Sequence, residues 1–367
     1  MEEILTENSV KEVENKKSRN SSIELLRIIL MFFIVLSHSY RYFTYADKSG
    51  LTKYFIMFTS VSNVMVNVFI LISGYFLCKK NFSFKKLVLL LLEVSFYSIV
   101  SYFIAISSKT ADFSFKKLIM AIFSTSFRSY WFVWAYCALY CLSPFINKLI
   151  AVLNRKQHLS LILIIFAIWF FIPFITTVSP DGYDVFVMIF FYLIGAYLRI
   201  YPDCFFNKGK NGLYALIVGY ALFILSILCL TVLGKHISLL GSHPMYFTSK
   251  HSFVSVIFAI GLFVVFSKMN FYSKIVNIIA QSIFGVYVIH NNGYLREIIF
   301  CKIFKVNGLN GSLKNVLYVI GSSVIIFVTC VLIDLIRKYT LEKFTSYSYD
   351  KISGKIKNKT SKSNEEK

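Results

Sequence analysis

Long apolar stretches recur along most of the chain, separated by short polar segments. Each stretch has about 20 residues, which is enough for a helix rising 1.5 Å per residue to cross ~30 Å of hydrocarbon. The pattern therefore predicts an all-α integral membrane protein with ten membrane-spanning helices. Their expected bounds are 22–43, 54–77, 87–107, 131–150, 158–176, 184–200, 212–233, 251–267, 275–294 and 314–336.

Polar segments flank this apolar region. The lead-in, residues 1–21, mixes charges of both signs with few large apolar side chains, which predicts disorder. The first apolar stretch is too long for a removable signal peptide and lacks a small-residue cleavage site, so we expect a retained membrane helix. Residues 22–337 would then form one membrane domain, followed by a lysine-rich tail, 338–367.

Composition supports the membrane class and predicts an orientation. Hydrophobic residues make up 57% of the chain and charged residues only 16%, with a net charge of +21. If both termini are cytoplasmic, inward segments hold roughly 25 basic residues and outward loops about 13, as the positive-inside rule requires. The basic tail is therefore expected to contact anionic lipid headgroups, and nucleic acid is not an expected partner. The seven cysteines form no CxxC pair, so neither disulfides nor a metal site are predicted.

The first apolar stretch carries three ionisable residues between positions 23 and 38, namely Glu24, Arg27 and His38. Arg27 and His38 would lie within about 20° of one helix face and about 16 Å apart along the axis. Ionisable groups inside a membrane are costly, so this face predicts a polar cavity, and Glu24 is positioned to pair with Arg27. The alternative is that Arg27 reaches the inner headgroups and His38 lies near the outer surface.

Five sequence blocks follow one another in a familiar order. They are Arg27 and His38 with their ten-residue spacing, VNVFILISGYFL at 66–77, SYWFVWAYCALYCLSPF at 129–145, FYLIGAYL at 191–198 and FGVYVIH at 284–290. In this order the blocks resemble the acyltransferase 3 family of integral membrane acyltransferases. The chain departs from the family pattern at Asn67, where an acidic residue is common, and the hydrolase-like domain fused to some relatives is not expected here.

The resemblance implies transfer of an acyl group, usually acetyl, from a cytosolic coenzyme A thioester to a hydroxyl of a glycan or lipid-linked sugar. No cofactor is expected besides acetyl-CoA, the donor substrate. His38 would act as the base for the hydroxyl, or as a nucleophile that carries the acetyl group. Arg27 would contact the coenzyme A phosphates or the pantetheine carbonyls, since its guanidinium suits bidentate contacts.

Further residues are candidates for the donor side. Lys85 and Lys86 could bind the nucleotide phosphates, although lysines after a membrane helix commonly only fix its orientation. Ser73 could let the backbone approach the thioester, or, together with Gly74, could permit close helix packing.

Acceptor-side candidates lie in the predicted outward segments. Trp131 and Trp134 could stack on a sugar or belong to an interfacial aromatic belt. His290 and Asn291, at the end of the ninth predicted helix, could orient the acceptor or lie in an ordinary loop. The loop 108–130 could contain a short interfacial amphipathic helix.

Charged residues elsewhere in the apolar segments are expected to form pairs. Glu93 would pair with a basic group on another helix or remain protonated. Asp334 can pair with Arg337 and Lys338 at the end of the last helix.

Two other classes of protein are also consistent with the apolar pattern and a polar cavity. A transporter or flippase for a lipid-linked sugar would also need a polar cavity, but the sequence shows no paired repeats or matching broken helices. A sensor or assembly subunit would have no need of Arg27 and His38 on one face. The sequence therefore favours an O-acetyltransferase of a bacterial cytoplasmic membrane that modifies a capsular or other surface polysaccharide.

Overall fold

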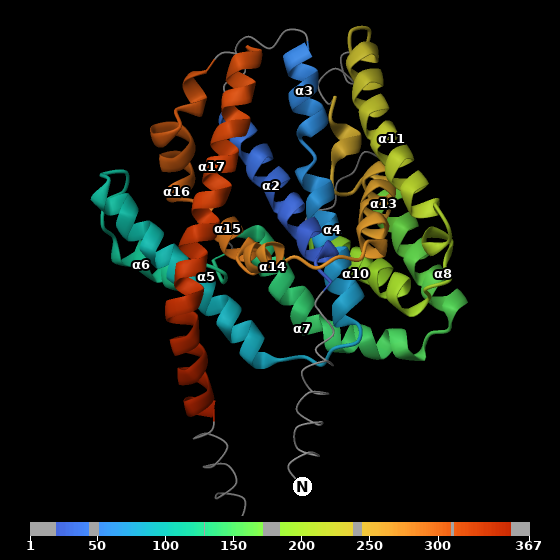
Figure 1. Cartoon of the computed structure of the whole chain (residues 1–367), viewed down its shortest axis with the longest axis horizontal. Coiled ribbons are helices and arrows are strands. Elements are labelled where there is room, and N and C mark those ends of the chain that lie inside the picture. Colours follow the sequence, from blue (N-terminus) through green and yellow to red (C-terminus); the bar gives the residue numbers. More distant parts are fainter. Residues whose placement is uncertain are drawn as a thin grey trace, which may run out of the picture.

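Among the residues that the structure describes, seven helical stretches are long and apolar enough to cross a membrane. The computed structural model describes residues 20–43, 51–127, 129–171, 184–237, 244–309 and 312–353, and within these ranges the regular structure is helical (Figure 1). The class predicted from the sequence is therefore confirmed. The seven stretches are Ser22–Tyr42 (α2), Lys53–Leu77 (α3, Leu51–Thr59, with α4, Ser62–Leu77), Phe84–Ser107 (α5), Trp131–Val152 (α7), Asn211–Leu233 (α11), Tyr246–Lys268 (including α13, Phe253–Lys268) and Leu313–Ser353 (α17, Leu313–Arg337, and its continuation).

Two more predicted spans correspond to shorter helices. Helix α8 (Arg155–Phe166) continues as the π-helix Ala167–Phe171, and the end of the predicted span 158–176 lies outside the described residues. Helix α10 (Asp184–Ile200) matches the prediction 184–200 but has only 17 residues.

The prediction of one continuous helix over residues 275–294 is wrong. The structure has two short helices there, α14 (Lys274–Ala280) and α15 (Ile283–His290), separated at Gln281 and Ser282. Backbone groups freed by such a break are tolerated at membrane depth where they are buried in protein or line a cavity. Ala280, Gln281 and Ile283 line the main cavity described below, which explains how the break is accommodated.

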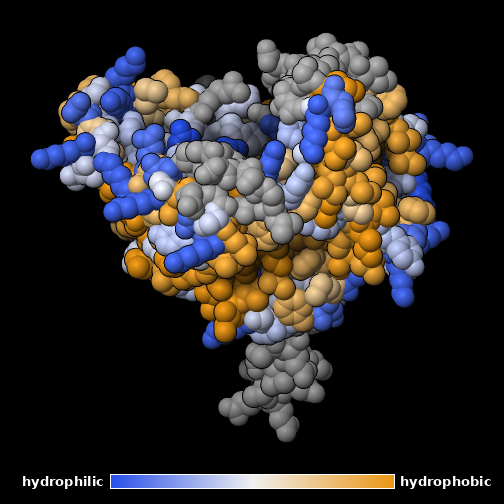
Figure 2. Space-filling view, turned by 90° about the horizontal axis from the view of Figure 1, so that it is seen from above, coloured by the Kyte–Doolittle hydropathy of each residue, from blue (hydrophilic) through white to orange (hydrophobic). Residues whose placement is uncertain are grey.

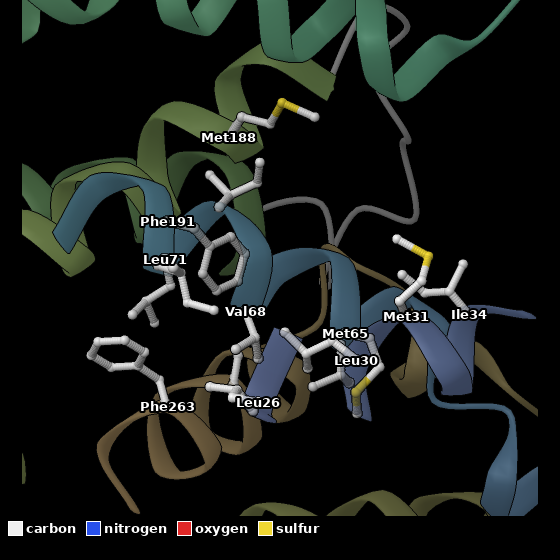
Figure 3. Close-up of a cluster of buried hydrophobic side chains, with 14 of the residues drawn as sticks. Leu26, Leu30, Met31, Ile34, Met65, Val68, Leu71, Met188, Phe191 and Phe263 are labelled. Carbon is white, nitrogen blue, oxygen red and sulfur yellow. The ribbon is translucent and has the colours of Figure 1, made fainter. Parts of the chain in front are cut away.

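Helix α2 lies inside the bundle, and its apolar face forms much of the core. Figure 3 shows Leu26 and Leu30 of α2 beside residues of α4, α10 and α13, three helices far apart in the sequence. Leu26 and Leu30 are completely buried. Because one face of α2 is fixed in this way, its opposite face is held in a defined orientation. The labelled partners are Met65, Val68, Leu71, Met188, Phe191 and Phe263.

Two glycines allow α4 and α10 to pack closely. A Cβ atom on Gly74 would overlap the backbone carbonyl of Tyr192, and one on Gly195 would overlap the carbonyl of Leu71. Small residues at such crossings let membrane helices approach each other. The structure therefore supports a role of Gly74 in close helix packing.

The outer surface of the bundle is apolar over large areas. Figure 2 shows broad hydrophobic regions on the flanks with hydrophilic side chains projecting around them. Apolar patches of this extent are rare on soluble monomers and mark contact with lipid or a partner. On α17 the exposed apolar residues include Leu317, Ile325, Val328, Leu332 and Ile336.

The described residues include only part of each predicted flanking segment. The predicted lead-in, 1–21, lies outside the described residues except for its last two positions. The predicted tail does not begin with a break in the helix, because the chain remains helical through the π-helix Lys338–Glu342 to Ser353. The short helix expected within 108–130 is present as α6 (Phe115–Ile122).

Candidate functional site

One face of α2 lines an interior cavity of about 300 Å³. The lining residues on this helix are Arg27, Met31, Ile34, His38 and Arg41, spaced alternately by four and three positions. This spacing keeps side chains on one side of a helix. The structure therefore brings Arg27 and His38 to the same cavity, as their spacing predicts. We call it the main cavity.

Within the described residues, four other parts of the chain also contribute to its wall. They are helix α4, helix α5, helix α7, and the segment that runs from the end of α14 into α15. Most of the side chains that they contribute are apolar. These residues are Ser62, Asn63, Val66, Phe69, Ile72, Ser73, Leu90, Trp131, Phe132, Tyr136, Ala280, Gln281, Ile283, Phe284 and Tyr287.

The His38 ring contacts a second histidine. Its Nδ1 atom lies 2.9 Å from Nε2 of His290, whose own Nδ1 lies 2.6 Å from the carbonyl oxygen of Val286. A carbonyl oxygen only accepts, so Nδ1 of His290 carries a proton, and in the neutral ring Nε2 is the acceptor. His38 must then donate from Nδ1. Its Nε2 atom is left unprotonated, as a base requires.

His290 is held firmly in place. Its side chain is completely buried, and the residue ends α15. Asn292, just beyond the helix, donates to the hydroxyl of Tyr130, and that hydroxyl donates to the carbonyl of Val288 in α15. These contacts join the end of α15 to the start of α7, which fixes the backbone that carries His290.

A second cavity, of about 510 Å³, lies at the N-terminal end of α2. Glu24 and Arg27 line it and form an ion pair, with Arg27 Nη1 3.2 Å from both carboxylate oxygens. Two further cations, Lys80 and Arg199, also line it. We call it the inner cavity. Three cations and one carboxylate among the described lining residues give it an excess of positive charge.

The two cavities meet at three shared lining residues, Arg27, Ser73 and Tyr136. Arg27 thus borders both spaces. Its guanidinium lies 6.0 Å from the centre of the Phe76 ring, and the Lys80 ammonium lies 5.9 Å from the same ring. Arg199 donates to the Tyr75 hydroxyl and lies over that ring, so adjacent aromatic residues of α4 orient the cations of the inner cavity.

Some predicted site residues lie at these cavities and others do not. Ser73 and Trp131 line the main cavity, whereas Trp134 and Asn291 are not among its described lining residues. Lys85 pairs with Asp350 of the α17 continuation at 2.7 Å, and both groups are substantially exposed.

Lys86 borders a third cavity of about 430 Å³, between α5 and α17, and not the inner cavity. The structure therefore does not bring Lys85 or Lys86 to Arg27. The cations that it does bring there, Lys80 and Arg199, were not predicted from the sequence. Lys80 follows α4, and Arg199 is in the last turn of α10. The residues next to each of them do not distinguish it from basic residues that only fix the orientation of a membrane helix.

Glu93 pairs with a basic group on another helix, which was one of the two alternatives drawn from the sequence. Its Oε1 atom lies 3.0 Å from Nη2 of Arg337, and Arg337 Nε donates to Asp334 at 2.8 Å. Tyr97 donates to the same Asp334 oxygen at 2.8 Å. Asp334 is completely buried against Gly285, where a Cβ atom would overlap the carboxylate. This network joins α5, α15 and α17.

The fold and the site together define a multi-pass helical membrane protein in which an arginine and a histidine of one helix face a common interior cavity. The family model described as "Acyltransferase domain", that of the acyltransferase 3 family, matches residues 20–335. The chain belongs to this family of membrane acyltransferases. Comparisons with curated proteins and with solved structures gave no match.

Proposed function

We propose that the protein is an O-acetyltransferase of a bacterial cytoplasmic membrane. It transfers acetyl from acetyl-CoA to a hydroxyl of a capsular or other surface polysaccharide, or of its lipid-linked precursor. The observation that carries the proposal is the main cavity, in which the unprotonated Nε2 of His38 shares one space with Arg27. Family membership supports the reaction class.

The proposed reaction needs one base and one activated donor. Nε2 of His38 takes the proton of the acceptor hydroxyl while the oxygen attacks the thioester carbonyl carbon. The tetrahedral intermediate collapses with cleavage of the carbon–sulfur bond, and the coenzyme A thiolate receives the proton from His38. His290 acts as a positioning residue, because its acceptor nitrogen keeps the proton of His38 on Nδ1.

The donor is assigned to the inner cavity. Coenzyme A carries several phosphate charges, and the side chains of Arg27, Lys80 and Arg199 supply positive charge there. In the orientation expected from the basic residues, this cavity opens toward the cytoplasm, where acetyl-CoA is made. The acetyl group then extends past Ser73 and Tyr136 toward His38.

Deletion and complementation would test the proposal. A strain lacking the gene is complemented with the wild-type chain, His38→Ala or Arg27→Ala, and its surface polysaccharide is compared by proton NMR. We expect the acetyl methyl signal to return only with the wild type, at equal protein levels in the membrane. Arg155→Gln is a matched control, because Arg155 forms an exposed pair with Asp203 and lines neither cavity.

The same experiment distinguishes an acetyltransferase from a flippase. A flippase would reduce the amount of surface polysaccharide in the deletion strain, whereas an acetyltransferase would leave the amount similar and remove its acetyl groups. Full acetylation by the His38→Ala variant would contradict the proposed function.

A further inference from the structure

The outer end of the main cavity carries a charge that the proposed reaction does not use. Arg41 lines the cavity one helical turn after His38, on the same face of α2. Among the described lining residues there are two arginines and no carboxylate. Arg27 is paired with Glu24 and is assigned to the donor. The positive charge of Arg41 therefore has no role in the proposed reaction.

No described acidic residue forms an ion pair with Arg41, and the residue is exposed. The charges of Arg41 and Arg296 lie close enough to act on the His38 ring. Arg296 has an acidic neighbour in Glu297, but neither residue lines the main cavity. A base that must accept a proton beside these cations is helped by a negative charge brought with the substrate.

A third cation contacts a residue of the main cavity without being one of its described lining residues. The ammonium of Lys250 lies 4.2 Å from the centre of the Trp131 ring, and Trp131 lines the main cavity. The backbone at Lys250 is held to α4, because Asn67 donates to its carbonyl at 3.1 Å and Asn63 donates to the nearby Thr248 carbonyl at 3.2 Å. The Lys250 ammonium lies over one face of the indole, which places a positive charge next to the cavity wall, where it attracts an anion.

We propose that the acceptor is anionic and that Arg41, with Lys250 beside Trp131, binds its charge while a neighbouring hydroxyl meets Nε2 of His38. This inference rests on the proposed function and specifies its acceptor class. The anion is a carboxylate of an acidic sugar or a phosphate of a lipid-linked sugar, since a guanidinium binds both through paired hydrogen bonds.

Protection of His38 from diethyl pyrocarbonate would test the proposal without knowledge of the natural acceptor. The full chain is placed in lipid nanodiscs, and carbethoxylation of His38 is followed by mass spectrometry. Three probes are compared at equal ionic strength: hyaluronan tetrasaccharide, which carries carboxylates; N-acetylglucosamine 1-phosphate; and chitotetraose, which is neutral and matches the first probe in length.

We expect at least one anionic probe to protect His38 at a concentration roughly tenfold below that of chitotetraose. The carboxylate and phosphate arms identify which anion is bound. Arg41→Gln should raise the half-protecting concentration of that probe roughly tenfold, the range for loss of one charge-assisted contact. The matched control is Lys314→Gln, because Lys314 is exposed in the part of α17 that packs near the end of α2 and does not line the cavity.

Equal protection by charged and neutral probes, no protection by any probe, or an unchanged response in Arg41→Gln would each overturn the proposal. A loss of activity in Arg41→Gln with unchanged anion protection would also overturn the proposal. It would show that Arg41 stabilises the transition state and does not bind the anion of the acceptor. Coenzyme A release from acetyl-CoA is measured on the same preparation. Anion protection without any such release would support the anion site but count against the proposed acetyl transfer.

Discussion

Nδ1 of His38 lies 2.9 Å from Nε2 of His290, a residue on a helix 252 positions later in the chain. This contact sets which nitrogen of His38 is free to act as a base. We expect His290→Leu to lower kcat about 10- to 100-fold with little change in the KM for acetyl-CoA, a loss typical of supporting hydrogen bonds. His290→Gln, whose amide oxygen can accept from His38, should recover part of the rate. Equal rates in the two variants would contradict the positioning role.

Removing the proposed base itself should have a larger effect. His38→Ala is expected to lower the transfer rate by roughly 10² to 10⁴, the usual contribution of a positioned acid or base. The rate is measured as coenzyme A release that depends on added acceptor. Binding of acetyl-CoA should persist, because the donor is assigned to the inner cavity. A variant that lost acetyl-CoA binding would show that His38 belongs to the donor site.

The donor site can be located by comparing two pairs of lysine and arginine residues. Lys80→Gln and Arg199→Gln should each raise the KM for acetyl-CoA about 3- to 30-fold, because both cations line the inner cavity with Arg27. Lys85→Gln and Lys86→Gln should leave it nearly unchanged. Steady-state kinetics at varied acetyl-CoA concentration would measure all four values. The reverse pattern would return the donor to the lysines predicted from the sequence.

Close packing of α4 against α10 should make Gly74 intolerant of a side chain. Gly74→Ala places a Cβ atom against the carbonyl of Tyr192, and we expect a loss of about 1–3 kcal/mol, as for overpacked cores. Gly321→Ala is the control, because it also lies in a helix and its added Cβ would meet no atom within 4 Å. Thermal unfolding in one detergent would compare them. Equal melting temperatures would contradict the close packing.

The buried network around Arg337 should matter more than an exposed ion pair. Arg337→Gln leaves Glu93 and Asp334 without their cation, and loss of one partner from a buried pair costs roughly 3–5 kcal/mol. Arg155→Gln removes an exposed pair with Asp203 and should leave unfolding unchanged. The Arg155 guanidinium lowers the pKa of Asp203, but both groups remain in solvent. Stability of the two variants is measured in nanodiscs.

Features that depend on one helix were accessible from the sequence. Arg27 and His38 share a cavity because helical spacing alone sets the angle between their side chains. The membrane class followed in the same way from the length of the apolar stretches. The geometry within one helix does not depend on how the helices pack, so it can be predicted from the sequence alone.

Features that depend on several helices were not accessible in this way. The contact of His38 with His290 and the gathering of Lys80 and Arg199 around Arg27 need the packing of distant helices. The break at Gln281 was missed because its flanking residues are apolar enough to read as one continuous helix. Arg41 was not singled out from the sequence, although it lies only three residues after His38 and helical spacing puts it on the same face.

The junction of the two cavities at Arg27, Ser73 and Tyr136 has a consequence for the choice of donor. Under the proposed reaction only the acyl moiety passes this junction, while the far bulkier nucleotide stays behind and leaves by the route through which it came. The side chains of Ser73 and Tyr136 would then border the path of the acyl chain. The size of these two side chains is therefore expected to influence how long an acyl group can reach His38.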